Sequence, residues 1–230
     1  MLKKLLIIAL VSLALVGCAQ PKTDAELVAE GWVKNPTENG YVFQEELPVA
    51  RDLTKKYTPS QGAAEVNCAA DSYAAACSGV GVENLDKFLN RDDVVYIDLR
   101  DYKDYTQKHF KNFEVIPYFA FVFNAAANTD TTMVQLFGGS PTEPVAVYNE
   151  SVAILNAIFP KDQTIFLMCQ SGARVVWMMQ ILEANGYDMS KIYNVGGMGQ
   201  YTASKYAKMV TDTAEFRVNA VYSLEGATRK

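Results

Sequence analysis

The sequence predicts an α/β protein whose central parallel sheet is flanked by helices. Short runs rich in β-branched and aromatic residues, typical of buried strands, alternate with segments whose apolar residues recur at helical spacing. This alternation starts near Val82 and continues to about residue 209. Strands that alternate with helices form parallel sheets covered on both faces, because each crossover helix packs back onto the sheet.

Each expected element has a local signal. Residues 93–99 (DVVYIDL) form an apolar run of strand length, and Leu85, Phe88 and Leu89 share one helical face. In chain order we then expect a polar helix at 101–108, a short strand at 115–118, an amphipathic helix at 151–159, a strand at 164–168, a helix at 173–184, a strand at 191–195 and a helix at 200–209.

Both ends of the chain carry extensions, and residues 124–148 show no clear period. In the extensions we expect a brief helix at 24–30, two short strands at 32–33 and 41–43 around a polar turn, a loop of small residues at 59–81, and a weak edge strand at 215–222.

The amino terminus has the pattern of an export signal. Lys3 and Lys4 precede an apolar run over residues 5–16, which is too short to span a bilayer comfortably, and the run ends in Gly17-Cys18. This ending resembles a bacterial lipobox, where the signal is cut before the cysteine and the thiol is lipidated. We therefore expect an extracytoplasmic protein that lipid on Cys18 anchors to the cell membrane. The alternative is an ordinary signal peptide that ends near a cysteine.

The charge, the cysteines and the single histidine limit which partners, disulfides and metal sites we expect. The formal net charge is −5 and no basic stripe is present, so we expect no nucleic-acid partner. With Cys18 lipidated, Cys68 and Cys77 lie close together in the small-residue loop, and in an oxidising compartment they could form a disulfide; the alternative is two free thiols. His109 is the only histidine, so we expect no metal site.

Cys169 stands where a predicted strand gives way to a predicted helix. Residues 169–174 (CQSGAR) place the cysteine at the carboxyl end of the strand, the edge at which ligands of open α/β sheets collect. Backbone N–H groups of the loop and of the helix start favour a thiolate at this position. Gly172 permits a tight loop, and Arg174 is a permanent cation for an anionic substrate. These residues predict a nucleophilic sulfur in an anion-binding loop.

Four motifs together resemble the rhodanese-like sulfurtransferases. That family has an active-site loop that begins with cysteine, with glycine fourth and often arginine last, as in CQSGAR. Its strand ending in Asp-x-Arg is similar to residues 96–100 (YIDLR). Its Gly-His-Ile-x-Gly-Ala-x-x-Ile-Pro motif is matched in part by residues 108–117 (KHFKNFEVIP), and its Gly-Gly-x-x-x-Trp motif by residues 196–201 (GGMGQY). The four motifs occur in the family's order over about residues 83–208.

The resemblance implies a rhodanese-like fold and a sulfurtransferase that needs no cofactor. Sulfane sulfur would pass from a small anionic donor, such as thiosulfate or a persulfide, through a persulfide on Cys169 to a thiol or cyanide-like acceptor. The substrate-binding loop would consist of Gln170, Ser171, Gly172, Ala173 and Arg174. Asp98 and Arg100 would form a structural ion pair, and His109 would lie in a structural loop near Asp98.

The chain departs from the family pattern at three places. Lys108 and Asn112 replace both glycines of the histidine motif, although asparagine tolerates positive φ better than other non-glycine residues. Residues 124–160 are longer than the equivalent segment of compact members.

A cysteine phosphatase or arsenate reductase would need arginine where this chain has Val175, so that alternative is disfavoured.

The expected organisation is therefore a lipoprotein signal peptide (1–17), an N-terminal extension with the disulfide loop (18–82), a rhodanese-like domain (83–208) with an insertion at 124–160, and a C-terminal extension (209–230). The alternative to catalysis is a catalytically silent rhodanese-like module at the membrane surface. In that module the insertion and the N-terminal extension would bind a protein partner.

Overall fold

The computed structural model describes residues 23–29, 32–34, 41–43, 45–213 and 226–230. The expected signal peptide, Cys18 and the weak strand at 215–222 lie outside these residues. The chain divides into two compact units, Met1–Gln44 and Glu45–Lys230. Within the described part of the chain, no helix has both the length and the apolar character needed to cross a membrane.

The first unit contains the helix and the two strands that the sequence predicts. Helix α2 (Asp24–Ala29) is followed by β1 (Trp32–Lys34) and β2 (Tyr41–Phe43), which pair in antiparallel fashion. Thr23 caps the helix: its hydroxyl accepts the Glu26 N–H (3.3 Å), and the Glu26 carboxylate accepts the Thr23 N–H (2.7 Å). This reciprocal capping satisfies donors that the first turn leaves without partners.

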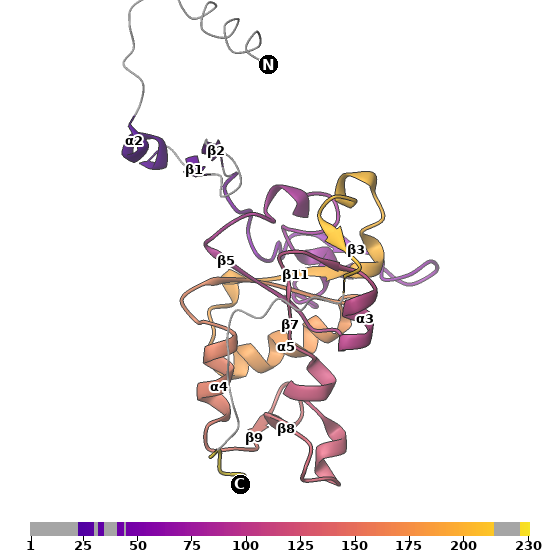
Figure 1. The fold of residues 1–230 in the computed structure, drawn as a ribbon. Coiled ribbons are helices and arrows are strands. Elements are labelled where there is room, and N and C mark those ends of the chain that lie inside the picture. The colour runs from indigo at the N-terminus through magenta and orange to yellow at the C-terminus, as the bar shows by residue number, and fades with distance from the viewer. Residues whose placement is uncertain (1–22, 30–31, 35–40, 44, 214–225) are drawn as a thin grey trace, which may run out of the picture. The chain divides into compact units, whose positions relative to one another are not determined.

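The second unit is built on a four-stranded parallel sheet, so the α/β prediction is confirmed (Figure 1). Its order is β11 (Ile192–Gly197), β10 (Thr164–Cys169), β5 (Val94–Asp98) and β7 (Glu114–Val115). β10 pairs with β5 on one side and β11 on the other. The apolar runs that the sequence predicts as strands at 93–99 and 164–168 therefore form the two central strands of the sheet, β5 and β10, where both faces are buried.

Alternation along β10 divides the core between the two faces of the sheet. Ile165, Leu167 and Cys169 enter one apolar cluster, whereas Phe166 and Met168 enter the other. Helices α4 (Ser151–Ile158) and α5 (Ala173–Ala184) contribute to the first cluster and lie on one side of the sheet in Figure 1. The 3₁₀ turn η2 (Leu85–Lys87) contributes to the second. Cys169 therefore faces the α5 side.

The helix predicted at 200–209 is wrong: the structure has two 3₁₀ turns, η6 (Met198–Gln200) and η7 (Ser204–Tyr206). Tyr201 and Tyr206 are both buried, and their rings meet edge to face at 4.9 Å. In an α-helix, residues five apart differ in direction by about 140°, because each residue turns about 100°. A regular helix could not place both tyrosines in the core.

The remaining elements are short. The polar helix is α3 (Tyr102–Gln107), and the strand expected at 115–118 ends at Val115 and leads through Pro117 into a π-helical turn, η3 (Tyr118–Val122). Residues 124–148 form η4 (Ala125–Asn128) and the antiparallel pair β8 (Phe137–Gly139) and β9 (Pro144–Ala146). The other elements are β3 (Lys56–Tyr57), β4 (Val66–Asn67), η1 (Ala75–Cys77), β6 (His109–Phe110), η5 (Met189–Lys191) and β12 (Val210–Thr211).

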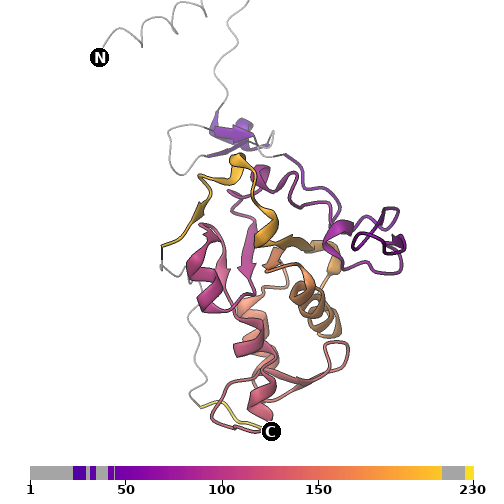
Figure 2. The same ribbon diagram turned by 90° about the vertical axis from the view of Figure 1, so that its right-hand side faces the viewer.

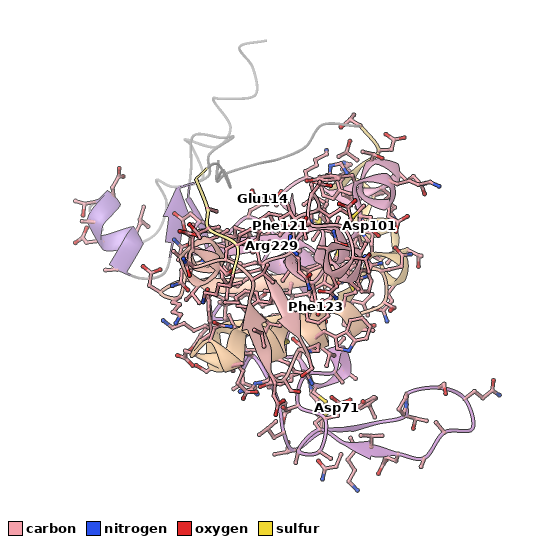
Figure 3. All side chains as sticks on the ribbon, turned by 90° about the horizontal axis from the view of Figure 1, so that it is seen from below. Asp71, Asp101, Glu114, Phe121, Phe123 and Arg229 are labelled. Atoms are coloured by element: carbon pink, nitrogen blue, oxygen red, sulfur yellow. A yellow bond between two sulfur atoms is a disulfide. The ribbon has the colours of Figure 1, made fainter. Side chains whose placement is uncertain are left out.

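β3, just before the small-residue segment expected at 59–81, pairs with β4 inside that segment, and the two form a hairpin that extends from the rest of the second unit (Figure 2). Asp71 lies at the base of this hairpin (Figure 3) and accepts the Tyr57 hydroxyl (2.8 Å). Cys68 and Cys77 form a disulfide with their Cα atoms 5.6 Å apart, and both are fully buried. The bridge therefore closes a short loop that ends in η1.

Candidate active site

Cys169 is the last residue of β10, and its side chain is 1 % exposed. The Gly172 N–H donates to its sulfur (3.1 Å), and Gly172 is the N-cap of the 12-residue helix α5. The first N–H groups of a helix have no intrahelical acceptor and together carry a partial positive charge. The structure thus places the sulfur at the start of a helix, with a backbone donor directed at it.

Both the N–H and the carbonyl of Gly172 make hydrogen bonds. Its N–H contacts the cysteine sulfur, and its carbonyl accepts the Asn194 side-chain amide (3.2 Å) and the Val176 N–H (3.3 Å). Its φ of +97° lies in the left-handed region that favours glycine. Glycine at this position lets the chain turn from β10 into α5 while its amide stays on the sulfur.

Asn194 is a functional candidate that the sequence analysis missed. It is buried in β11, where its side-chain amide donates to the carbonyls of Tyr73 (2.8 Å) and Gly172, and its side-chain oxygen accepts the Gly196 N–H (2.9 Å). A polar residue inside an apolar strand must find such partners, and this is the signal that could have identified it. Asn194 joins the cysteine loop, the end of β11 and the segment before η1.

The end of β11 approaches the cysteine loop so closely that only glycine fits. A β-carbon added to Gly197 would lie 2.2 Å from the Gln170 carbonyl oxygen, and Gly196 has a φ of +87°. In the sheet register Cys169 lies beside Gly197. Gly197 therefore packs directly against the backbone of residues 170–171.

The disulfide segment also touches the cysteine loop. A β-carbon on Gly172 would lie 3.4 Å from the Ala75 side chain, so η1 packs directly against the turn. Burial and a hydrogen bond to Glu183 of α5 raise the pKa of Tyr73 to about 12. Residues expected to belong to an extension thus form one wall of the site.

Arg174 lies in the first turn of α5, but its guanidinium already has neighbours. It donates to the Leu99 carbonyl (3.3 Å), lies 3.7 Å from the Asp101 carboxylate and sits over the Phe119 ring at 5.5 Å. In the described part of the chain, no hydrogen bond joins it to the Cys169 sulfur. The Asp101 carboxylate therefore partly neutralises Arg174, the residue that we expected to bind an anionic substrate.

Asp98 and Arg100 form a buried ion pair at the end of β5. The Arg100 guanidinium and backbone N–H all donate to the Asp98 carboxylate, at 2.7–3.0 Å, and the guanidinium also donates to the carbonyls of Asp104 (3.1 Å) and Lys108 (2.7 Å). Burial raises the pKa of Asp98, and the hydrogen bonds and charge of Arg100 oppose that rise. These contacts hold the chain after β5 to the end of α3.

His109 is buried and has the contacts of a structural residue. Its Nδ1 donates to the Tyr105 carbonyl (2.8 Å), and the two rings stack with centroids 3.8 Å apart. Burial lowers the pKa of His109, which favours the neutral imidazole. In the described residues it makes no hydrogen bond to Cys169, so the structure does not bring the only histidine to the sulfur as a base.

The two replaced glycines of the histidine motif have side-chain partners. Lys108 has an extended backbone (φ −168°), and its ammonium donates to the Tyr201 carbonyl (3.0 Å). The Asn112 amide donates to the Leu89 carbonyl and to Asn90. Side-chain hydrogen bonds therefore fasten this turn without glycine.

The rest of the cysteine loop is open to solvent: Gln170, Ser171 and Ala173 are exposed. Among the described residues, no group of three or more His, Cys, Asp or Glu side chains is arranged to hold a metal ion. The arrangement offers one sulfur at the start of a helix with a backbone N–H directed at it, and an arginine in the first turn of that helix whose charge Asp101 partly neutralises.

Comparison with known proteins adds one weak likeness. No protein-family model matches the chain, and no curated protein sequence matches it. Among solved structures, the chain is similar to the single-domain sulfurtransferase RDL2 of Saccharomyces cerevisiae, with a TM-score of 0.36 and 15 % sequence identity. The alignment covers 56 % of this chain and 91 % of that one. At this level of similarity the functional argument depends on the geometry of the site.

Proposed function

We propose that the protein is a rhodanese-type sulfurtransferase that carries sulfane sulfur on Cys169. The observation that supports the proposal best is the Gly172 N–H on the Cys169 sulfur, at the meeting point of a parallel strand and the start of α5. A thiolate and a terminal persulfide anion are both stabilised by such donors. The four motifs shared in order with the rhodanese-like family support the same function.

In the proposed reaction the Cys169 thiolate attacks the outer sulfur of a small anionic donor. A new S–S bond forms, the bond between that sulfur and the donor breaks, and the leaving group departs with the electron pair, as sulfite does from thiosulfate. An acceptor such as cyanide then attacks the terminal sulfur and leaves as thiocyanate, which restores the thiolate. No external oxidant, reductant or cofactor enters this cycle, and no strong general base is needed, in keeping with the position of His109.

Intact-mass spectrometry tests the proposal on the second unit and on the full chain. Thiosulfate, polysulfide or glutathione persulfide should add one sulfur atom, and cyanide should remove it. Cys169→Ala should abolish the gain, whereas the Cys68→Ala/Cys77→Ala double variant, which keeps Cys169, should retain it. A folded parent protein that gains no sulfur from any of the three donors would contradict the proposal.

One observation favours the second candidate, a catalytically silent binding module. Cys169 is almost fully buried, so a donor reaches its sulfur only if neighbouring residues move. Iodoacetamide labelling of the folded protein distinguishes the two. Slow labelling, at the rate of global unfolding, together with no sulfur uptake would favour the binding module.

We propose further that the protein is extracytoplasmic and anchored through lipid on Cys18. The support is the charged, apolar and small-residue pattern of residues 1–18. Cys18→Ser should release the protein from the membrane fraction or leave an unprocessed precursor. Maturation and membrane retention identical to the parent would contradict the lipid anchor.

A further inference from the structure

Asp101 occupies a position from which it would normally cap a helix, yet it does not. It is the N-cap residue of α3, but its carboxylate accepts no hydrogen bond from the first turn. The carboxylate lies instead 3.7 Å from the Arg174 guanidinium, and its side chain is 48 % exposed (labelled in Figure 3). A side chain at this position commonly satisfies backbone N–H groups of its own helix. Here the Asp101 carboxylate lies beside the Arg174 guanidinium instead.

This carboxylate changes which anions Arg174 can receive. An anion that approaches the guanidinium comes close to Asp101, and like charges at such distances repel. The repulsion acts twice as strongly on a dianion as on a monoanion at the same position, because the Coulomb energy is proportional to charge. The Arg174 guanidinium likewise attracts a dianion twice as strongly, so the Asp101 carboxylate offsets the preference that the cation alone would give to inorganic thiosulfate, a dianion at neutral pH, over a singly charged donor.

Apolar surface also lies next to the same guanidinium. Phe119, in the π-helical turn η3, is 45 % exposed and lies under the Arg174 guanidinium. Trp177, one turn after Arg174 on α5, is 40 % exposed, and its ring is 6.0 Å from that of Phe119. Residues three apart on a helix lie on one face. The pair thus offers partly exposed aromatic surface next to the loop, at a π-helical turn of the kind frequent at functional sites.

We infer that Asp101, Phe119 and Trp177 make the site selective for organic sulfane donors with a single negative charge. This inference rests on the proposed sulfurtransferase function and specifies its donor class. The class comprises organic thiosulfonates and persulfides, whose apolar body would contact the two rings. With a thiosulfonate, the Cys169 thiolate bonds to the terminal sulfur, the bond from that sulfur to the sulfonyl sulfur breaks, and the sulfinate leaves with the electron pair.

The test compares sulfur loading from thiosulfate and from benzenethiosulfonate, a monoanion with an aromatic body. Asp101→Asn should raise kcat/KM for thiosulfate about threefold to fivefold, mainly through KM, and that for benzenethiosulfonate less than twofold. Asp104→Asn is the matched control, since it removes the same charge three residues further on, in the first turn of α3. It should change neither value by more than about 1.5-fold. Trp177→Ala should lower kcat/KM for benzenethiosulfonate about fivefold and leave thiosulfate within twofold.

The outcomes separate this inference from the proposed function. If the folded parent takes sulfur from neither of these donors, nor from polysulfide or glutathione persulfide, the sulfurtransferase proposal fails. If it takes sulfur from one of the other donors but not from benzenethiosulfonate, the donor selectivity is overturned. If it takes sulfur from both, but Asp101→Asn and Asp104→Asn behave alike or Trp177→Ala affects the two donors equally, the donor selectivity is overturned. Asp101→Ser serves as a second variant, and equal melting temperatures of the variants and the parent exclude a folding effect.

Discussion

Asn194 shows how one buried side chain can hold the cysteine loop in shape. Its side chain, 2 % exposed, donates to the Tyr73 and Gly172 carbonyls and accepts the Gly196 N–H. The three partners lie on different segments of the chain. Gly172, one of its partners, also bonds the Cys169 sulfur. Asn194 is therefore a positioning residue: it acts on the sulfur through the glycine peptide and does not touch the sulfur itself.

Asn194→Ala should destabilise the protein by about 2–4 kcal/mol and change the reactivity of Cys169. The loss arises because the variant leaves buried backbone groups without partners. Chemical denaturation measures the first effect, and the pH profile of Cys169 alkylation the second. Asn156→Ala removes a half-buried asparagine that bonds only Tyr187 among the described residues, and it should leave the alkylation profile unchanged. An unchanged profile in Asn194→Ala would show that its role is structural alone.

The single histidine makes part of the pH dependence of stability predictable. Burial lowers the pKa of His109 from its ordinary 6.5, so at mildly acidic pH the unfolded chain binds a proton that the folded chain does not. Its contribution to stability is fully present above about pH 6.5 and is lost as pH falls through the folded pKa, with a slope of at most about 1.4 kcal/mol per pH unit. Urea denaturation between about pH 7.5 and pH 5 should show this slope, and His109→Gln should remove it. An equal slope in the variant would contradict this assignment.

On the scale of the elements, the end of β11 and the start of α5 together hold the cysteine loop in place. The loop fits because Gly197 has no side chain where the Gln170 carbonyl passes, and because Gly172 adopts a positive φ. The contact on Gly197 involves backbone atoms on both sides, so neither partner can move away cheaply. The geometry of the sulfur site therefore depends on packing between two elements, and not on the loop sequence alone.

Gly197→Ala should reduce sulfur loading more than tenfold and destabilise the protein by about 2 kcal/mol or more, since the new methyl group would overlap the loop backbone. Gly199→Ala provides the control, because the nearest atoms to an added β-carbon there lie 3.8 Å away. It should keep at least about half of the parent loading rate. Sulfur-loading rates and melting temperatures of both variants check the prediction. Equal tolerance of the two substitutions would mean that the loop does not rest on β11.

On the scale of the whole molecule, the Cys68–Cys77 disulfide belongs to the second unit, together with the sheet. The bridged segment carries the Tyr73 carbonyl that accepts from Asn194 and the Ala75 methyl group that packs near Gly172. A covalent constraint outside the predicted catalytic domain is thus connected to the cysteine loop by direct contacts.

Replacing both bridged cysteines with alanine should lower the free energy of unfolding by about 2–3 kcal/mol, as the loop-closure account predicts for a bridge between residues nine apart. Because η1 supports the loop, the variant should also bind sulfur more slowly, by about twofold to fivefold. Denaturation curves and loading rates of the parent and the double variant test this. Unchanged loading with reduced stability would show that the bridge stabilises the fold without influencing the site.

Periodicity and composition by themselves determined the α/β class, the central strands, α5 with its bounds and the place of Cys169 at the end of a strand, since these depend on local apolar patterns. The helix predicted at 200–209 failed because burial of Tyr201 and Tyr206 overrode local helical preference. Only the tertiary structure brought Asn194, Ala75 and Asp101 to the cysteine loop. These residues come from segments far apart in the chain, and no local pattern records which of them meet when the sheet forms.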